Sequence, residues 1–479
     1  MKSENLLPVP DLEELFALEG PLARRNPGYE FRDEQVLLAR EIEGAITDGS
    51  VLVAEAGTGV GKSMAYLVPA AIWAASSGKR VLISTHTKAL QEQLVQKDLP
   101  VVAAALSEAG LALNFAHLMG ADNYLCVQRL EAAKRRAEDH KEDGSVRQML
   151  GELLDWAATS RSASRSAIPF SVPPQVWSMV CRDTDICLGD RGPYRDRCLY
   201  KKERQRALAS HILVVNHSLF LSGGWCPPYH AVVFDEAHNL EAAAKDLMTR
   251  QASTSRWDRL VNDIYNPESR KGLARRILAA DRALEAEATR VLSRAKKEGR
   301  KFFHQVAADH ELTERDPATP ARRLKEDYKT DNTLDPVLKS FLDMFKAWGK
   351  QVENEEEEAE LGALVRRCTE FNVDLNAFLH GEESGLAHWV EREKDWIGLQ
   401  IAPLDLSEAL KHEWDQLAEK KIGLVFTSAT LATGDSMEHF MHSHGIHKAN
   451  DLKLGSPFDF KNNACLFLDP SIPSPQQNP

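Results

Sequence analysis

The segment AEAGTGVGKS, residues 54–63, is the most specific chemical signal in the sequence. Its glycines at Gly57, Gly59 and Gly61 would let backbone N–H groups turn toward a phosphate, because glycine has no Cβ atom to clash. The segment follows an apolar run and precedes a predicted helix, which is the context that a phosphate-binding loop requires. It departs from the general pattern at one point, where Ala56 replaces the first glycine.

Three polar residues give this loop its chemistry. Thr58 lies between two of the glycines, and Lys62 and Ser63 close the segment. Lys62 would reach the β- and γ-phosphates of a nucleotide, and the Ser63 hydroxyl would hold Mg²⁺.

A second motif is VVFDEAHNL, residues 232–240. Its apolar strand would deliver Asp235 and Glu236 to the carboxyl end of a parallel sheet, where such sheets place their ligands. Asp235 would hold Mg²⁺, directly or through water, and Glu236 would orient and deprotonate the attacking water. An Asp-Glu pair after a strand is commonly just an exposed end. The upstream phosphate loop and the nearby His238 favour a catalytic group of Glu236, Asp235, Lys62 and His238.

The elements that must position these motifs follow an α/β pattern. Residues 51–54 and 81–85 are short β-branched apolar runs, and residues 65–76 between them fit a helix. This βαβ order predicts a parallel sheet. Further strands are predicted at residues 211–215, 231–234 and 423–427.

The long stretch between the last two strands has a different character. Leu273, Ile277, Leu284, Ala288 and Val291 recur at helical spacing, so we expect a helical insertion in the parallel-sheet domain.

Two further segments are read from composition. The acidic run at Glu353 and Glu355–Glu358 is expected to be a solvated helix face. The proline-rich end, residues 470–479, is expected to be a linker.

Composition sets broad limits. The 479 residues allow about three or four domains, and 43% hydrophobic with 27% charged residues exclude disorder or a coiled-coil rod as the main architecture. A net charge of −12 argues against coating nucleic acid with the whole surface, although a local basic channel stays compatible with it. The longest mostly apolar stretch, residues 65–75, is too short to span a bilayer, and residues 1–16 do not resemble a secretory signal. We therefore expect a cytoplasmic protein with no membrane partner.

Four of the seven cysteines gather in one region: Cys126, Cys181, Cys187 and Cys198. Their spacings of 54, 5 and 10 intervening residues fit neither zinc-finger pairs nor a ferredoxin run. From spacing alone, a shared metal site and buried free thiols both stay open.

The charge changes sign around the last of these cysteines. Residues 191–206 carry a net charge of +5, including Arg195 and Lys201, with Tyr194 and Tyr200 interleaved. Basic side chains that pair with phosphates, together with aromatic rings that stack on bases, hold single strands without reading sequence. The alternative is an ordinary solvated helix face.

Several motifs together resemble a known family. The D-E-A-H residues 235–238, STHTKALQEQ (84–93) and FTSATL (426–431) resemble superfamily 2 helicases. The four-cysteine block, VVNHSLFL (214–221) and the helical insertion are similar to the DinG-type branch of the XPD-like iron–sulfur helicases. The resemblance extends from about residue 30 to about residue 460, nearly the whole chain.

This resemblance implies roles for further residues. Arg32 and Gln35 match the motif that reads adenine, and Thr85 and Thr87 match the motif that contacts the DNA backbone. The same resemblance places Asn216 in the coupling and DNA-binding set.

Later in the sequence, Ser428 to Thr430 match the motif that links hydrolysis to strand movement. Residues 454–460 resemble the start of the second motor domain. The resemblance also assigns the four cysteines to a [4Fe–4S] cluster, although thiolates suit zinc equally well.

The fold implied is an α/β, P-loop, RecA-like parallel-sheet motor lobe with an inserted iron–sulfur domain and an inserted helical arch domain. The expected boundaries are 1–115, 209–245 and 396–434 for the first motor lobe, 116–208 for the iron–sulfur domain, 246–395 for the arch and 435–479 for the start of the second lobe.

The implied function is that of an ATP-dependent DNA helicase that moves 5′→3′ in DNA repair or replication-stress recovery. ATP, Mg²⁺ and the cluster would be its cofactors. Its partners would be single-stranded and forked DNA, with DNA–RNA hybrids and single-strand-binding protein as further candidates, and we expect a monomer.

Two other functions stay open. One is an ATPase that remodels R-loops or protein–DNA complexes, and the other is a non-catalytic single-strand-binding fragment. The family's Q-x-x-G-R-x-I-R-like motif, which supplies arginines to the γ-phosphate, does not occur in the sequence. We therefore expect a truncated helicase with little activity of its own.

Overall fold

A seven-stranded parallel sheet forms the base of the molecule in the computed structural model, with strand order β11-β1-β10-β5-β2-β4-β3. All its strand pairs are parallel, as the βαβ pattern predicts. The strands are β1 (Val51–Ala56), β2 (Val81–Thr85), β3 (Phe115–His117), β4 (Ile212–Asn216), β5 (Ala231–Asp235), β10 (Gly423–Ser428) and β11 (Asn450–Leu454). The structure describes residues 10–26, 28–139, 144–265, 272–278, 282–312, 321–324, 328, 330–380, 385–465 and 467. The proline-rich segment expected to be a linker lies outside them.

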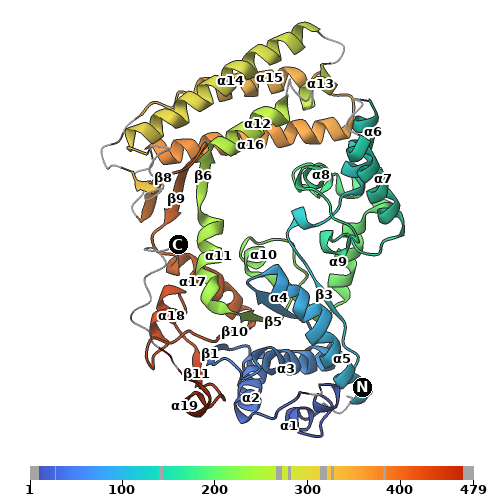
Figure 1. The fold of residues 1–479 in the computed structure, drawn as a ribbon, viewed down its shortest axis with the longest axis vertical. Coiled ribbons are helices and arrows are strands. Elements are labelled where there is room, and N and C mark those ends of the chain that lie inside the picture. Colours follow the sequence, from blue (N-terminus) through green and yellow to red (C-terminus); the bar gives the residue numbers. More distant parts are fainter. Residues whose placement is uncertain are drawn as a thin grey trace.

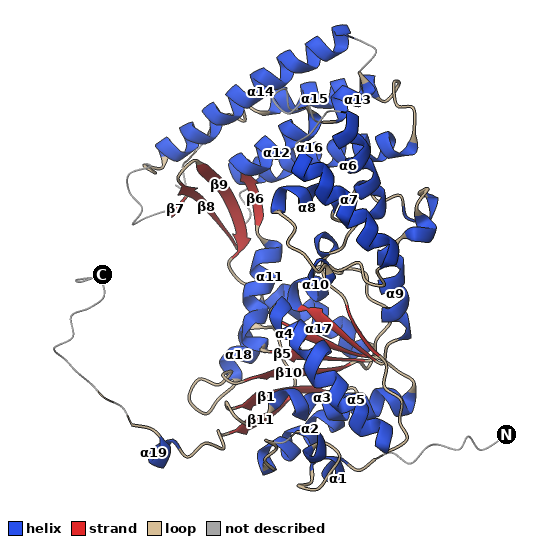
Figure 2. Ribbon diagram, turned by 45° about the vertical axis from the view of Figure 1, so that its right-hand side comes forward, coloured by secondary structure: helices blue, strands red, loops and turns tan. Residues whose placement is uncertain are grey.

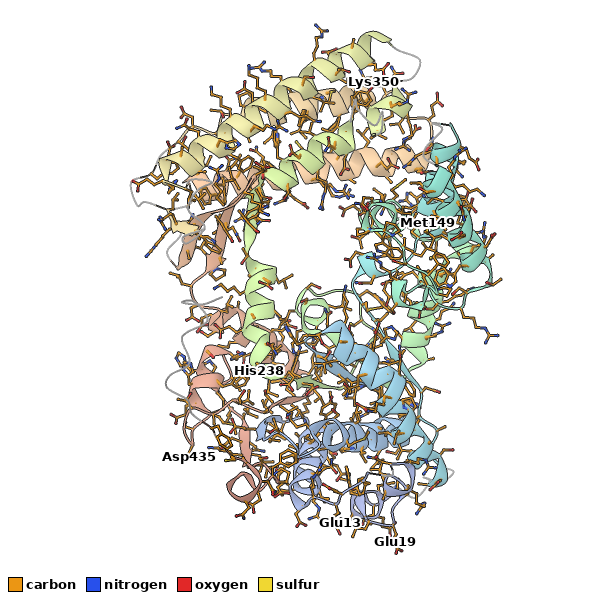
Figure 3. The ribbon with its side chains drawn as sticks, in the orientation of Figure 1. Glu13, Glu19, Met149, His238, Lys350 and Asp435 are labelled. Carbon is orange, nitrogen blue, oxygen red and sulfur yellow. The ribbon has the colours of Figure 1, made fainter. Side chains whose placement is uncertain are left out.

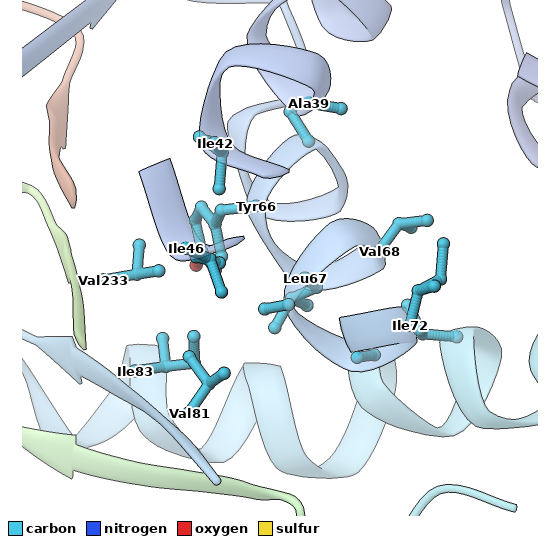
Figure 4. Close-up of a cluster of buried hydrophobic side chains, with 14 of the residues drawn as sticks. Ala39, Ile42, Ile46, Tyr66, Leu67, Val68, Ile72, Val81, Ile83 and Val233 are labelled. Atoms are coloured by element: carbon cyan, nitrogen blue, oxygen red, sulfur yellow. The ribbon is translucent and has the colours of Figure 1, made fainter. Parts of the chain in front are cut away.

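Successive side chains of each strand pack on opposite faces of this sheet. On β2, Val81 and Ile83 join one buried cluster, whereas Leu82 joins the cluster on the other face. On β5, Val233 lies in the first cluster and Phe234 in the second. Both faces are apolar because helices cover both, which is the usual state of a parallel sheet (Figure 2). Figure 4 shows part of the first cluster, where Val81, Ile83 and Val233 face residues of α2 and α3.

The helices around the sheet divide between these two faces. Residues of α1, α2, α3 and α5 contribute to the first cluster, and residues of α9 (Leu199–Ala209), α10, α11, α17 and α18 to the second. The flanking helices are α1 (Leu12–Phe16), α2 (Asp33–Asp48), α3 (Lys62–Ser77), α4 (Lys88–Gln93), α5 (Leu99–Glu108), α10 (His217–Leu221), α11 (Leu240–Met248), α17 (Ser407–Glu419) and α18 (Glu438–Ser443). The short helix α19 (Phe460–Asn463) follows β11.

The chain between β3 and β4 forms a first insertion that carries the four clustered cysteines. Its helices are α6 (Val127–Asp139), α7 (Gly144–Thr159), α8 (Pro174–Val180) and α9 (Leu199–Ala209). They enclose a hydrophobic cluster of their own, which includes Leu130, Leu153 and Trp177.

The chain between α11 and α17 forms a second insertion. Its long helices are α12 (Thr254–Ile264), α14 (Arg282–Asp309), α15 (Asp335–Trp348) and α16 (Glu355–His380), with the short α13 (Leu273–Ile277) among them. The insertion is not wholly helical, because it includes an antiparallel sheet of order β6-β9-β8-β7. These strands are β6 (Arg250–Ser253), β7 (Ala321–Arg323), β8 (Leu386–Glu393) and β9 (Trp396–Pro403).

The two insertions meet at the N-terminal half of α16, beside α6 (Figure 1). Arg136 of α6 pairs with Glu356 at 3.4 Å and with Glu360 at 3.1 Å, and Arg276 also pairs with Glu360. The acidic run is therefore not simply a solvated face as expected. Glu356 is only partly exposed and contacts the other insertion, while Glu355 and Glu358 are exposed.

Gly423 provides a test of how α2 is seated on the sheet. A Cβ atom at Gly423 would lie 2.7 Å from the Ala45 carbonyl oxygen and 3.0 Å from the Ile46 Cα. We expect Gly423→Ala to lower the free energy of unfolding by about 1–3 kcal/mol, measured by urea denaturation.

Gly44→Ala is the matched control, since Gly44 is exposed on α2 and has open space around it. We expect this change to raise the free energy of unfolding by about 0.5–1 kcal/mol. An unchanged midpoint for Gly423→Ala would show that α2 does not pack tightly on β10.

Candidate functional site

The phosphate loop lies between β1, which ends at Ala56, and α3, which begins at Lys62. Gly59 and Gly61 have φ angles of 93° and 84°, which side-chain-bearing residues rarely adopt. Gln35 lies against this loop, because its Nε2 donates to the Gly61 carbonyl at 2.9 Å. The structure thus places the predicted adenine-reading glutamine beside the predicted phosphate loop. Arg32, the other residue of that motif, pairs with Glu30 at 2.8 Å.

The two predicted Mg²⁺ ligands converge on one tyrosine. Tyr66, one turn into α3, donates its hydroxyl to Asp235 Oδ2 at 3.0 Å and also interacts with Ser63. Asp235 is only 5% exposed, and its burial, together with the charge of Glu236, raises its pKa to about 6. A buried carboxylate beside a hydroxyl is a donor set that suits Mg²⁺, and a bound cation would favour the charged form.

Glu236 lies where the phosphate loop and β5 come together. Its Oε1 is 4.0 Å from Lys62 Nζ, which is itself 3.5 Å from the Ala56 carbonyl oxygen. Glu236 also has a φ of 53°, in the left-handed region that a non-glycine residue occupies only at a cost in energy. Strain of this kind clusters at functional sites, where the surrounding contacts hold the residue in place.

The neighbouring strand β10 supplies those contacts. Ser428 Oγ donates to Glu236 Oε2 at 3.2 Å and lies 2.6 Å from His238 Nδ1. His238 Nδ1 is also 3.3 Å from Glu236 Oε2, and the Thr430 N–H donates to Ser428 Oγ at 3.4 Å. The motif predicted to couple hydrolysis to movement therefore contacts the predicted catalytic glutamate directly. Figure 3 shows His238 beside the start of α11, far from both insertions.

Sequence reasoning missed several contacts around this site. Glu55 Oε2 accepts from the Leu431 and Ala432 N–H groups at 2.6 Å each, which ties the phosphate-loop strand to the segment after Thr430. Ser456 Oγ donates to the Thr58 carbonyl at 2.8 Å, so the segment after β11 covers the phosphate loop. The position of Tyr66 one turn after Lys62 was the signal that could have found its role.

The residues predicted to contact DNA already bond within the chain. Thr85 is buried, and its hydroxyl donates to the Thr87 carbonyl at 3.4 Å, while Thr87 caps α4 through the Leu90 N–H. Asn216 likewise caps α10.

The basic stretch remains on the surface. Arg195 and Lys201 are exposed, at 3.8 Å from Asp196 and 2.7 Å from Asp190 respectively. Part of its charge is therefore balanced locally.

The four clustered cysteines come from separate turns of the first insertion and carry free thiols. The Cys126 N–H donates to the Val180 carbonyl at 2.9 Å, next to Cys181. Burial raises the pKa of the Cys126 thiol, and nearby Cys187 and Cys198 add to the rise. Within the described residues, however, no group of three or more His, Cys, Asp or Glu is arranged to hold a metal ion.

A cavity of about 330 Å³ lies beside these cysteines, at the contact between the two insertions. Cys126 and Cys187 line it, whereas Cys181 and Cys198 do not. The donor set and the adjoining space fit a thiolate-bound group, although the thiols would have to move closer together to share it.

The loop between Cys181 and Cys187 is held from the second insertion. Arg367 of α16 pairs with Asp183 at 2.6 Å and with Asp185 at 3.3 Å. From within the first insertion, Arg129 donates to the Cys181 carbonyl.

Comparison with known proteins places the chain in a family. The DEAD/DEAH box helicase family matches residues 39–125. The ATP-dependent DNA helicase YoaA of Escherichia coli (strain K12) is 30% identical over an alignment 479 positions long, which covers 96% of this chain and 69% of that protein. This chain belongs to the YoaA/DinG family of ATP-dependent DNA helicases.

Other members of the YoaA/DinG family are more distant. YoaA of Haemophilus influenzae is 28% identical over 97% of this chain and 69% of its own length. The 3′-5′ exonuclease DinG of Bacillus subtilis (strain 168) is 26% identical over 96% of this chain and 52% of its own length. A solved structure titled "Truncated XPD" aligns with a TM-score of 0.41 at 13% identity, over 87% of this chain and 99% of that chain. None of the described helices is both long and apolar enough to cross a membrane.

The different positions of Lys62 and Glu236 predict different losses. We expect Lys62→Ala to weaken binding of a fluorescent ATP analogue strongly, because it removes the cation aimed at the β- and γ-phosphates. Glu236→Gln keeps the shape of the side chain, so binding should stay within about threefold while hydrolysis is lost. Equal losses of affinity in the two variants would contradict these roles.

The resemblance to the iron–sulfur helicases predicts which thiols matter for iron. After anaerobic purification, the wild-type chain should contain about four irons and absorb visible light. Cys181→Ser and Cys187→Ser should lose both properties. Cys368→Ser is the control, because Cys368 is buried in the core of the second insertion. Stoichiometric zinc without visible absorption would contradict an iron–sulfur cluster.

Proposed function

We propose that this chain contains the first motor lobe of an ATP-dependent DNA helicase and performs the ATP-binding and coupling steps. The observation that carries this proposal is the position of Glu236, whose carboxylate lies between Lys62 of the phosphate loop and Ser428 of β10. A carboxylate in this position can orient a water molecule toward the γ-phosphate of ATP held on the loop.

The roles of the neighbouring residues follow from this position. Asp235 and Ser63 hold Mg²⁺, which neutralises charge on the phosphates when it is bound. The phosphate loop binds ATP through Gly57, Thr58, Gly59 and Gly61, with Arg32 and Gln35 at the adenine. His238 and Ser428 fix the carboxylate of Glu236, and the contact of Ser428 with Thr430 carries the state of the nucleotide to the rest of the molecule.

The DNA-binding role rests on the family and on the exposed basic stretch. We propose single-stranded and forked DNA as the substrate, with 5′→3′ movement and a role in DNA repair. Thr87, Asn216, Arg195 and Lys201 would lie along the strand, with Thr85 supporting the turn at Thr87. The two insertions, each with its own hydrophobic cluster, support the proposed iron–sulfur domain at 116–208 and an arch that begins near residue 246. The arch extends beyond the expected boundary at 395, because β9 (Trp396–Pro403) pairs with β6 and β8 and contributes Ile397, Leu399 and Ile401 to the same cluster.

The cysteine group is proposed to hold a [4Fe–4S] cluster through Cys126, Cys181, Cys187 and Cys198. When bound, such a cluster would cross-link segments that are far apart in the sequence, in the way that a metal replaces core packing in small domains. The cavity beside Cys126 and Cys187 supports this assignment.

Salt dependence tests the DNA-binding proposal. We expect residues 1–479 to bind an oligo-dT strand with an affinity that falls as salt rises, because phosphate pairing releases counterions. The double change Arg195→Ala and Lys201→Ala should reduce the slope of log affinity against log salt by about two. Arg40→Ala with Lys79→Ala removes the same charge from the α2–α3 side of the sheet, and should leave the slope unchanged.

Hydrolysis tests where catalysis is completed. We expect residues 1–479 to bind ATP but to hydrolyse it slowly, with or without oligo-dT. A fusion to the part of E. coli YoaA outside the alignment should hydrolyse ATP faster by about 10³–10⁵, the value of an arginine at the γ-phosphate. Equal rates for the two proteins would contradict this division of labour. A fusion that hydrolyses ATP without separating strands would favour a remodelling ATPase.

A further inference from the structure

His217 is a buried polar residue that none of the roles above uses. It begins α10 directly after β4, and only 1% of its surface is exposed. Its Nδ1 lies 2.8 Å from the Ser84 hydroxyl on β2. This buried hydrogen bond ties the end of β4, which His217 follows, to Ser84 of β2.

The strand order places this hydrogen bond next to the strand that carries the catalytic pair. β2 lies between β4 and β5, so that Ser84 is paired with Val215 on one side and with Phe234 on the other. The ring of His217 lies 6.3 Å from the Phe234 ring, and also 6.3 Å from the ring of His86. His217 therefore reaches across β2 toward the end of β5, which carries Asp235 and Glu236.

The second nitrogen of this ring is also buried. Among the described residues, His217 Nε2 makes no hydrogen bond of standard geometry, but main-chain groups of Glu236 and Asp235 lie close enough to interact with the ring. Burial, with a contribution from His86, lowers the pKa of His217 to about 3, against an opposing effect from main-chain groups of Glu236 and Asp235. The ring lies against the main chain that holds Glu236 in its left-handed conformation.

We propose that His217 is a positioning residue that links the DNA-contacting segment after β2 to the main chain of the catalytic Glu236. The Ser84 bond ties the ring to the strand that leads to Thr85 and Thr87. The second nitrogen, Nε2, is a donor or acceptor held beside the Asp235–Glu236 main chain. A shift of β2 on binding DNA moves this ring, and the position of the Glu236 carboxylate changes with it.

His444 shows what a purely structural histidine looks like in the same lobe. It is also buried, with 3% of its surface exposed, its Nδ1 donates to the Phe440 carbonyl at 2.9 Å, and its Nε2 has no partner among the described residues. Its Nδ1 bonds within its own helix and the turn that follows it, so it connects no two strands. His444→Ala is therefore the matched control for His217→Ala.

The test is the mutual effect of two ligands, and it rests on the proposed function. The affinity of residues 1–479 for a fluorescent ATP analogue with Mg²⁺ is measured with and without saturating oligo-dT. For the wild-type chain and His444→Ala, we expect the two affinities to differ by about fivefold or more. For His217→Ala, the difference should fall below about twofold, while each ligand alone binds within about twofold of wild type.

Two milder variants separate positioning from folding. Ser84→Ala removes only the hydroxyl, and should reduce the mutual effect as His217→Ala does. The double variant should be no worse than His217→Ala alone, because both changes break one connection. His217→Asn keeps a polar atom near Ser84 but loses Nε2, so it should also lose the effect.

The outcomes distinguish this inference from the proposed function. Full coupling in His217→Ala, Ser84→Ala or His217→Asn, or no coupling in the wild-type chain that binds both ligands, would overturn the role of His217. Failure of the wild-type chain to bind either ligand would instead contradict the proposed function, and the inference with it.

Discussion

The placement of one carboxylate governs the arrangement of the motor lobe. Glu236 follows a buried strand with a φ of 53°, and a side chain in that conformation needs contacts on more than one side to stay there. Lys62 lies near one carboxylate oxygen, Oε1, while Ser428 and His238 lie near the other, Oε2. Ser428 and His238 also contact each other. These contacts require β1, β10 and β5 to be neighbours, which is the order that the sheet has.

The two insertions contact each other mainly through charged side chains, whereas the sheet and its helices contact each other through apolar ones. Each has its own hydrophobic cluster, but their contact with each other consists largely of arginine–carboxylate pairs at α16. Such pairs weaken as salt rises, and partly exposed ones contribute little to stability individually. The contact at Arg367 is of particular interest because two of its acidic partners, Asp183 and Asp185, lie between Cys181 and Cys187. The loop that would carry two cluster ligands is therefore shaped by both insertions.

Much of the motor lobe was predictable because its signals are local. All five predicted strands and the helix after the phosphate loop occur, each within two or three residues of its predicted ends, because the apolar runs are short and bounded. The strands β6 and β7 were not predicted, since their pairing partners lie far away in the sequence. The strands β8 and β9 form a local hairpin, which was missed because their residues alternate weakly. The contacts of Glu55, Tyr66 and Glu356 were missed for a related reason. Each joins elements whose proximity only the folded chain reveals.

The same strand order explains how two distant ligands can influence each other in one lobe. From β1 to β4 the sheet presents in turn the phosphate loop, the Ser428 motif, the catalytic pair, the segment with Thr85 and Thr87, and Asn216. A nucleotide at one end and a DNA strand at the other are therefore separated by two or three strands of a rigid, close-packed sheet. Small displacements in such a sheet pass through side chains that bridge strands, because the packed interior cannot absorb them. Ser428 with Glu236 bridges β10 and the end of β5, and His217 with Ser84 bridges the end of β4 and β2. The ring contact of His217 with Phe234, at 6.3 Å, joins these two pairs across β2 and β5. Glu55 connects β1 to the segment after β10, because its carboxylate accepts from the N–H groups of Leu431 and Ala432.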